Sequence, residues 1–369
     1  MQLAIVCTMI NGFGRKGFYN SQEIGLARAL AARGHTVTVY KGVAREETAE
    51  ERRVSPRVTV RYIPMKSVGP HGYLHTRLLQ LPLDALLCFA DQQQFIPHIE
   101  AFCRRRGIAF VPYVGTAHSL HSGLRAKVMD FLFSQGTLRL YKRMPVLAKT
   151  EAARAELQAL GVRDIAVAPV GLDVAELKQD FDQADRAALR RAYGFSESDV
   201  IICNVSRLDP EKRPLDLIDL LARIQNVKPF RLLMVGEGAL RQALEQKIAA
   251  HGLTDRVTLL DRVPYERMWE IYTLSDYYVN LNRGEIFGMA VMEAVYYRAS
   301  VAAIAALGPS TTLRGMAGHR LCADDDEIAA WLAGPYPSKE ELRESSEKMA
   351  RLFSWDRCAQ AFLTAAKKA

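Results

Sequence analysis

The stretch EIFGMAVME, residues 285–293, sets two glutamates eight positions apart around a mostly apolar segment with one glycine. Glu293 has apolar neighbours on both sides, because the run continues as AVYY. A carboxylate in such surroundings is costly unless hydrogen bonds satisfy it. A surface helix with two solvated acids fits this setting poorly. The pattern therefore favours a binding role for the two glutamates.

The sequence around this stretch alternates between strand-like and helix-like segments. In the second half, VIICNVSRL, FRLLMVGEG and YYVNLN read as strands separated by amphipathic helices. The first half shows the same alternation, with LAIVCTMI and HTVTVYKG as strands. Asn20 and Glu23 are predicted to cap the helix that connects these two strands. This alternation predicts an α/β fold with parallel sheets covered by helices on both faces. We expect domains at 1–170 and 171–345, and a final helix within 346–369 that packs back on the first domain.

The composition is that of a globular protein with an uneven charge. Of its 369 residues, 1–180 contain 24 Lys and Arg against 15 Asp and Glu, a net +9, whereas the remainder has 25 against 26. This excess points to an anionic partner for the first half: nucleic acid, a membrane surface or a phosphorylated substrate. No nucleic-acid-binding motif accompanies this charge excess.

There is no run of about 18 apolar residues, which argues against a membrane span. Six scattered cysteines without a CxxC pair argue against zinc and for a cytoplasmic location.

The position of the opening stretch indicates what it binds. Glu285 follows a predicted strand in the loop that opens a helix, where open parallel sheets bind ligands. Gly288 falls in the first helical turn, where free N–H groups favour a phosphate. Arg207 and Lys212 follow another strand at the same sheet edge, and could form a diphosphate clamp. Their alternative interpretation is surface solvation.

Five motifs in order resemble the GT-B glycosyltransferases, in particular the retaining, family 4-like group with an E-x7-E motif. They are SRLDPEK (206–212), LLMVGEG (232–238), VTLLDRVPYERMWEIY (257–272), EIFGMAVMEA (285–294) and FSWDR (353–357). The resemblance implies two Rossmann-like doubly wound domains facing across a cleft. It also implies metal-independent transfer of a sugar from a UDP- or GDP-sugar to a glycan or lipid-linked acceptor, in cell-surface polysaccharide or glycolipid synthesis. The nucleotide sugar is a co-substrate, and no cofactor is implied.

The resemblance also implies roles for individual residues. Arg207 and Lys212 would hold the diphosphate, Glu285 the sugar hydroxyls and Glu293 the ribose hydroxyls. His118, after a strand of the first half, would lie near the donor sugar, whereas the neighbouring His121 is more readily structural. The other donor-binding residues implied are Gly12, Gly14, Gly236, Gly238, Arg262, Val263, Phe287, Gly288 and Met289.

Two features qualify this assignment. The string ADDDE, 323–327, contains the D-x-D that binds metal in other sugar transferases, but it opens a helix, where aspartates cap free N–H groups. The segment AALGPSTTL, 305–313, replaces the glycine-rich turn common in the family and lacks its acid. This departure leaves the donor sugar open.

Three alternatives remain. Gly12, Gly14 and Gly17 spell the G-x-G-x-x-G of an NAD-dependent oxidoreductase, although the acid expected at the end of the second strand is absent. A sugar-nucleotide epimerase or hydrolase would not explain the basic first half. An inactive scaffold subunit would be expected to lack Arg207, Lys212 or Glu293.

The segment 124–144 bears on the acceptor. LRAKVMDFLFSQGTLRLYKRM mixes five cations with large apolar residues, as an interfacial helix does, and as a half-buried helix also does. We expect peripheral attachment to an anionic membrane at the inner face of the cell membrane.

Overall fold

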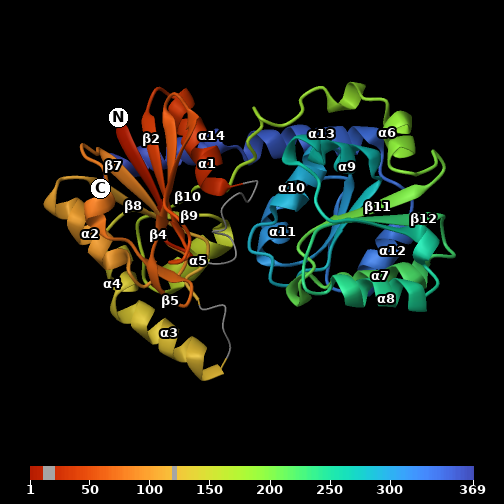
Figure 1. Ribbon diagram of the computed structural model, residues 1–369, viewed down its shortest axis with the longest axis horizontal. Coiled ribbons are helices and arrows are strands. Elements are labelled where there is room, and N and C mark those ends of the chain that lie inside the picture. The colour runs from red at the N-terminus through yellow and green to blue at the C-terminus, as the bar shows by residue number, and fades with distance from the viewer. Residues whose placement is uncertain (11–20, 119–122) are drawn as a thin grey trace. The chain divides into compact units, whose positions relative to one another are not determined.

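The computed structural model describes residues 1–10, 21–118 and 123–369, with the side chains of 123–126 left undescribed. The chain forms two compact units, Met1–Gly171 with Ser354–Ala369, and Leu172–Phe353 (Figure 1). Each is a Rossmann-like α/β unit, which confirms the predicted fold class. No helix among these described residues is both long and apolar enough to cross a membrane.

The first unit is built on an eight-stranded sheet of order β10-β9-β8-β7-β1-β2-β4-β3, in which only β3 runs antiparallel to its neighbour. Its strands are β1 (Gln2–Cys7), β2 (Thr36–Val43), β3 (Glu50–Ser55), β4 (Val58–Pro64), β7 (Ala85–Phe89), β8 (Ala109–Val114), β9 (Val146–Ala148) and β10 (Ile165–Val167), beside a hairpin of β5 (Lys66–Val68) and β6 (His71–Tyr73). Its helices are α1 (Gln22–Ala32), α2 (Ile96–Arg105), α3 (Gly123–Gln135), α4 (Thr137–Tyr141), α5 (Glu151–Ala159) and α14 (Trp355–Ala366).

The start of α1 differs from the prediction. The N-cap residue is Ser21, whose side chain makes no capping hydrogen bond, rather than Asn20, which lies outside the described residues. Glu23 does not cap the helix but forms a buried ion pair with Lys41 of β2. Two buried charges stabilise each other far better than either would be stabilised alone, so the pairing prevails over the cap. Lys41 also stands near the end of β2, where a dinucleotide-binding fold would carry an acid.

The second unit has a six-stranded, fully parallel sheet of order β13-β12-β11-β14-β15-β16. Its strands are β11 (Val200–Val205), β12 (Phe230–Val235), β13 (Val257–Leu260), β14 (Tyr277–Asn280), β15 (Ser300–Ile304) and β16 (Arg320–Cys322). Its helices are α6 (Arg186–Ala192), α7 (Pro214–Ile224), α8 (Arg241–Ala250), α9 (Met268–Leu274), α10 (Met289–Tyr296), α11 (Leu307–Thr312), α12 (Asp325–Ala333) and α13 (Lys339–Leu352). Helices α7, α8 and α12 cover one face of the sheet, and α9, α10 and α13 the other (Figure 1).

The C-terminal segment divides between the units later than predicted. The predicted final segment began at 346, but α13 runs to Leu352 and its buried side, including Ser346 and Met349, belongs to the second unit. Ser346 donates a hydrogen bond to the Tyr296 carbonyl of α10, which ties α13 to that unit. Only α14 packs in the first unit, against α1. There the Trp355 indole lies so close to Gly25 that a Cβ at this position would be 2.2 Å from Nε1.

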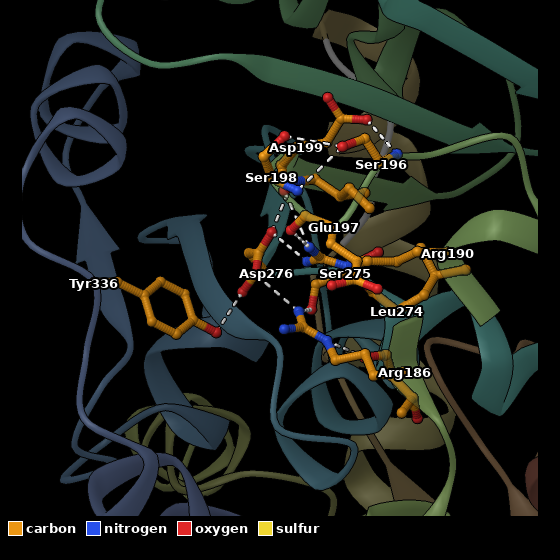
Figure 2. A network of polar contacts seen from close by, with 12 residues as sticks. Arg186, Arg190, Ser196, Glu197, Ser198, Asp199, Leu274, Ser275, Asp276 and Tyr336 are labelled. Carbon is orange, nitrogen blue, oxygen red and sulfur yellow. Dashed lines mark hydrogen bonds and ion pairs between the residues drawn. The ribbon is translucent and has the colours of Figure 1, made fainter. Parts of the chain in front are cut away.

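A polar network around the buried Arg190 fixes α6 at the amino edge of the second sheet (Figure 2). Asp276, just before β14, accepts hydrogen bonds from Arg186 at 2.8 Å and from Arg190 at 2.8 Å. The same carboxylate accepts from the Ile201 N–H of β11 at 2.7 Å, and the Asp276 carbonyl accepts from the Tyr336 hydroxyl at 3.0 Å. The amino edge is therefore filled by these side chains. The carboxyl edge of the sheet is left as the place for a ligand.

Candidate active site

The loop between β14 and α10 is shaped by two asparagines. The Asn280 side chain accepts from the Asn282 N–H at 2.9 Å, and the Asn282 side chain accepts from the Gly284 N–H at 2.9 Å. Asn282 also donates to Glu285 Oε2 at 3.1 Å, and the Glu285 carbonyl accepts from the Gly308 N–H at 2.8 Å. The loop is therefore held by its own side chains and by Gly308 at the start of α11, in the segment that departs from the family pattern.

Glu285 and Lys212 come from different strand ends and meet at this edge. Lys212 closes a short 3₁₀ turn (Pro210–Lys212) after β11, and its Nζ lies 2.9 Å from Glu285 Oε2, with both side chains 18% exposed. Burial alone would raise the pKa of Glu285, but Lys212 and the hydrogen bonds from Asn282 and Asn280 together lower it below its ordinary value. Glu285 is therefore ionised at neutral pH and holds the Lys212 ammonium group at the sheet edge.

Arg207 is oriented by its own loop. Its guanidinium forms ion pairs with Asp209 and Glu211, and its side chain is 45% exposed. Arg207 follows the carboxyl end of β11. An anion would compete with these two carboxylates for the guanidinium.

The start of α10 places backbone beside this pair. Gly288 is the N-cap residue, with φ 78° in the left-handed region that glycine adopts readily. Phe287 before it is buried and stacks edge-on against Phe353 at 6.4 Å, while Met289 is half-buried. The turn is thus anchored by Phe287 and opens the helix at Gly288.

Glu293 lies within α10, beyond its first turn, and is only 4% exposed. The Tyr272 hydroxyl of α9 donates to its Oε2 at 2.9 Å. Burial raises the pKa of Glu293 to about 7, and the bond from Tyr272 lowers it only in part. The ring of Tyr272 stacks on Tyr297 at 5.9 Å with an interplanar angle of 8°. The stacked Tyr272 therefore orients this carboxyl group through its hydroxyl.

The loops after β12 and β13 contain the remaining predicted residues of this unit. Gly236 has its backbone against the loop after β11: a Cβ there would lie 1.8 Å from the Ser206 carbonyl oxygen. Gly238 and Arg262 are exposed, and Val263 is buried. All of these positions follow strand ends, so they share the carboxyl edge of the sheet with Lys212 and Glu285.

The D-x-D string has the structural role that its helix-opening position predicted. Asp324 Oδ1 accepts from the N–H groups of Asp326 and Glu327, each at 3.0 Å, and so caps α12. Asp325 pairs with Arg213 at 2.7 Å. Among the described residues, no group of three or more His, Cys, Asp or Glu side chains is arranged to hold a metal ion.

His118 belongs to the first unit. Its side chain is 64% exposed, with Nε2 3.3 Å from Glu156 Oε1 of α5. The same oxygen accepts from the Ala117 N–H at 2.9 Å, so Glu156 holds both the loop and the ring. The predictions for Gly12, Gly14, Gly17 and His121 lie outside the described residues.

The sequence prediction missed several residues that shape the site. Asn280, Asn282, Tyr272 and Glu156 all hold a predicted residue in place. The alternation NLN at a strand end was a usable signal for the first two, since polar residues there seldom serve the core. Tyr272 and Glu156 had no such signal, because their partners are distant in sequence.

Two family models match the chain, one in each half. The model described as Glycosyltransferase Family 4 matches residues 24–176, and the model described as Glycosyl transferases group 1 matches residues 185–349. The second match contains Arg207, Lys212, Glu285 and Glu293. Together the two models span most of the chain.

Similar proteins agree with these matches. The chain is 27% identical to a D-inositol 3-phosphate glycosyltransferase of Geodermatophilus obscurus, over 96% of this chain and 85% of that protein. It is 29% identical to the protein of that name from Nocardia farcinica, over 69% of this chain and 60% of that protein.

Solved structures share the fold. The sucrose-phosphate synthase of Thermosynechococcus elongatus superposes with a TM-score of 0.75 at 18% identity, covering 99% of this chain and 98% of that one. Anabaena HepE in complex with UDP and glucose gives 0.69 at 16% identity, covering 100% of both chains. These findings favour the glycosyltransferase assignment over the oxidoreductase alternative. The chain therefore belongs to the GT-B glycosyltransferases, with a family 4 domain in its first half and a group 1 domain in its second.

Proposed function

We propose that this protein is a retaining glycosyltransferase that needs no metal ion. It transfers a sugar from a nucleotide-diphosphate sugar to a hydroxyl group of a glycan or lipid-linked acceptor. One observation carries the proposal: the half-buried Lys212–Glu285 pair beside the start of α10 at Gly288, with Glu293 further along the same helix. This arrangement offers a cation and free N–H groups for phosphates between two carboxyl groups for hydroxyls.

The donor diphosphate would contact Lys212 and Arg207. Each charge-assisted hydrogen bond contributes roughly 1.5–3 kcal/mol. Arg207 would exchange Asp209 and Glu211 for phosphate oxygens, and these acids keep the guanidinium oriented until the donor arrives. UDP is the first nucleotide to test, because Anabaena HepE is described in complex with UDP and with UDP-glucose.

The reaction breaks the bond between the anomeric carbon and the diphosphate oxygen and forms a bond from the acceptor oxygen to the same carbon, with configuration kept. The acceptor proton passes to the departing diphosphate. Lys212 and Arg207 stabilise the negative charge that develops on the leaving group, and cations already in position do so without reorganisation. Glu285 would orient the sugar hydroxyls.

A second acceptor class is a phosphorylated polyol. The similar proteins of Geodermatophilus obscurus and Nocardia farcinica are named for D-inositol 3-phosphate. The net +9 of residues 1–180 suits such an anionic acceptor. Transfer to D-inositol 3-phosphate but not to inositol would support this class, whereas transfer to neither would favour the glycan or lipid-linked acceptor.

The test is calorimetric binding of UDP, GDP and ADP without divalent metal. We expect one nucleotide to bind the wild type, and binding to be lost in Glu293→Gln but kept in Glu344→Gln, which changes an exposed glutamate of α13. Product analysis by NMR with the matching sugar nucleotide then reports the anomeric configuration. Binding of NAD(H) with no binding of any of the three nucleotides would overturn the proposal.

A further inference from the structure

Helix α3 carries an outward apolar face. Val128, Phe131 and Leu132 are 49%, 62% and 49% exposed. Their spacing of three and four residues places them on one side of the helix. We call these three residues the α3 stripe.

The opposite side of α3 is already satisfied by the first unit. Phe133 is buried, and its ring meets Tyr141 of α4 edge-on at 5.9 Å. Asp130 accepts a hydrogen bond from Gln92, in the loop after β7. The helix is therefore fixed by its inner side, and the exposure of the stripe does not result from a helix that has failed to pack.

Cations stand at both ends of the stripe. Lys127 is exposed one turn before Phe131, and Arg139 of α4 donates to Gln135, one turn after Phe131. Lys142 and Arg143 follow, both exposed. Residues 127–143 thus contain four cations and a single acid, Asp130, which faces Gln92.

We propose that the α3 stripe docks the protein on an anionic lipid surface. The three apolar side chains insert at the boundary between headgroups and acyl chains, and Lys127, Arg139, Lys142 and Arg143 contact the headgroup phosphates. An apolar stripe alone would fit a second protein copy equally well. The surrounding cations favour an anionic membrane, because two copies would bring like charges together.

If the proposed function holds, docking on a membrane also has a consequence for the acceptor. Helix α3 follows β8 in the chain and packs in the first unit through Phe133. A stripe held in the headgroup region would therefore keep the first unit at the membrane. A lipid-linked acceptor would then be presented to the first unit without leaving the bilayer.

The test is flotation of the full chain with vesicles, measured for three double variants. Phe131→Ser/Leu132→Ser shortens the apolar stripe, and Lys142→Ser/Arg143→Ser removes two cations. The control, Arg52→Ser/Lys66→Ser, removes two exposed cations elsewhere on the first unit and has the same net charge as the second variant. Vesicles are made of phosphatidylcholine alone, or of equal parts phosphatidylcholine and phosphatidylglycerol. Nucleotide calorimetry on each variant reports the second unit independently.

We expect the wild type to bind only the vesicles with phosphatidylglycerol, and less tightly as salt is raised. Each cation near an anionic surface strengthens binding about fivefold, so Lys142→Ser/Arg143→Ser should weaken it roughly 25-fold and the control variant should not. Phe131→Ser/Leu132→Ser should weaken binding roughly tenfold or more.

Three results would overturn the proposal: no vesicle binding by the wild type, equal binding to neutral vesicles, or binding that neither α3 variant weakens. A dimer in light scattering that Phe131→Ser/Leu132→Ser dissociates, without vesicle binding, would assign the stripe to a second copy instead. Loss of docking with nucleotide binding intact would leave the proposed function standing.

Discussion

Replacing Glu293 by glutamine should change how the stability of the second unit depends on pH. The carboxyl group is 4% exposed, and burial raises its pKa from an ordinary 4.5 to about 7. Below 4.5 both the folded and the unfolded chain hold the proton, and burial of the neutral acid costs little. Between 4.5 and 7 the unfolded chain ionises while the folded chain does not. The wild type therefore loses stability as pH rises through this window, and Glu293→Gln has no such loss.

The size of the effect follows from the two pKa values. A difference of one in pKa corresponds to about 1.4 kcal/mol, so the interval from 4.5 to about 7 gives roughly 3 kcal/mol. We expect the variant to gain this amount relative to the wild type between about pH 4 and about pH 8. Glutamine can still accept the Tyr272 hydrogen bond, which keeps other changes small.

Urea unfolding followed by circular dichroism over this pH range measures the effect. The free energies of unfolding of wild type, Glu293→Gln and the exposed control Glu344→Gln are compared at each pH. The control should follow the wild type, and Glu293→Gln should diverge from both above about pH 5. Parallel curves for all three proteins would refute the reasoning that Glu293 titrates as a buried acid.

Three further changes test other parts of the second unit. Lys212→Ala should lower kcat for sugar transfer by roughly 10²–10³, because the leaving group loses a cation, while the exposed Lys339→Ala leaves kcat unchanged. Asp276→Asn should lower the free energy of unfolding by about 3–5 kcal/mol, since two arginines lose their shared carboxylate. Asp326→Asn, in an exposed ion pair, should cost less than about 1 kcal/mol in the same urea titration. Gly236→Ala should weaken nucleotide binding in calorimetry, because its Cβ would displace the Ser206 backbone.

Each of these has a contrary outcome. Equal kcat for the two lysine variants would remove Lys212 from the reaction. An equal loss in free energy of unfolding for Asp276→Asn and Asp326→Asn would show that the Asp276 network at the amino edge of the sheet adds no stability. Unchanged nucleotide affinity in Gly236→Ala would separate the loop after β12 from the donor site.

The sequence was most informative where the pattern is local. Strands such as YYVNLN and the helices between them follow from short-range periodicity, and the right-handed connection of parallel strands then brings their carboxyl ends to one edge. This is why Glu285 and Lys212, 73 residues apart, could be expected together. The burial of Glu293 followed from its apolar neighbours for the same reason.

The sequence was least informative where long-range contacts decide. Asn20 and Glu23 form a plausible cap in isolation, yet Glu23 pairs with Lys41 because burial makes that pairing more favourable. Whether residues 346–353 join the first or the second unit depends on which surface their buried side meets, and periodicity does not encode that. The two acids beside Arg207 were visible in the sequence, but their side-chain orientation was not.

The return of the chain at Ser354 bears on the order in which the protein can be made. Residues 1–171 leave the ribosome first, but α14, which packs Trp355 against Gly25 of α1, is synthesised only after the whole of 172–353. Domains generally fold as units during synthesis, N-terminal first. Here all residues of the second unit are synthesised before the last helix of the first unit. Until α14 is made, α1 therefore lacks the helix that covers it. During translation that half is a candidate for chaperone binding.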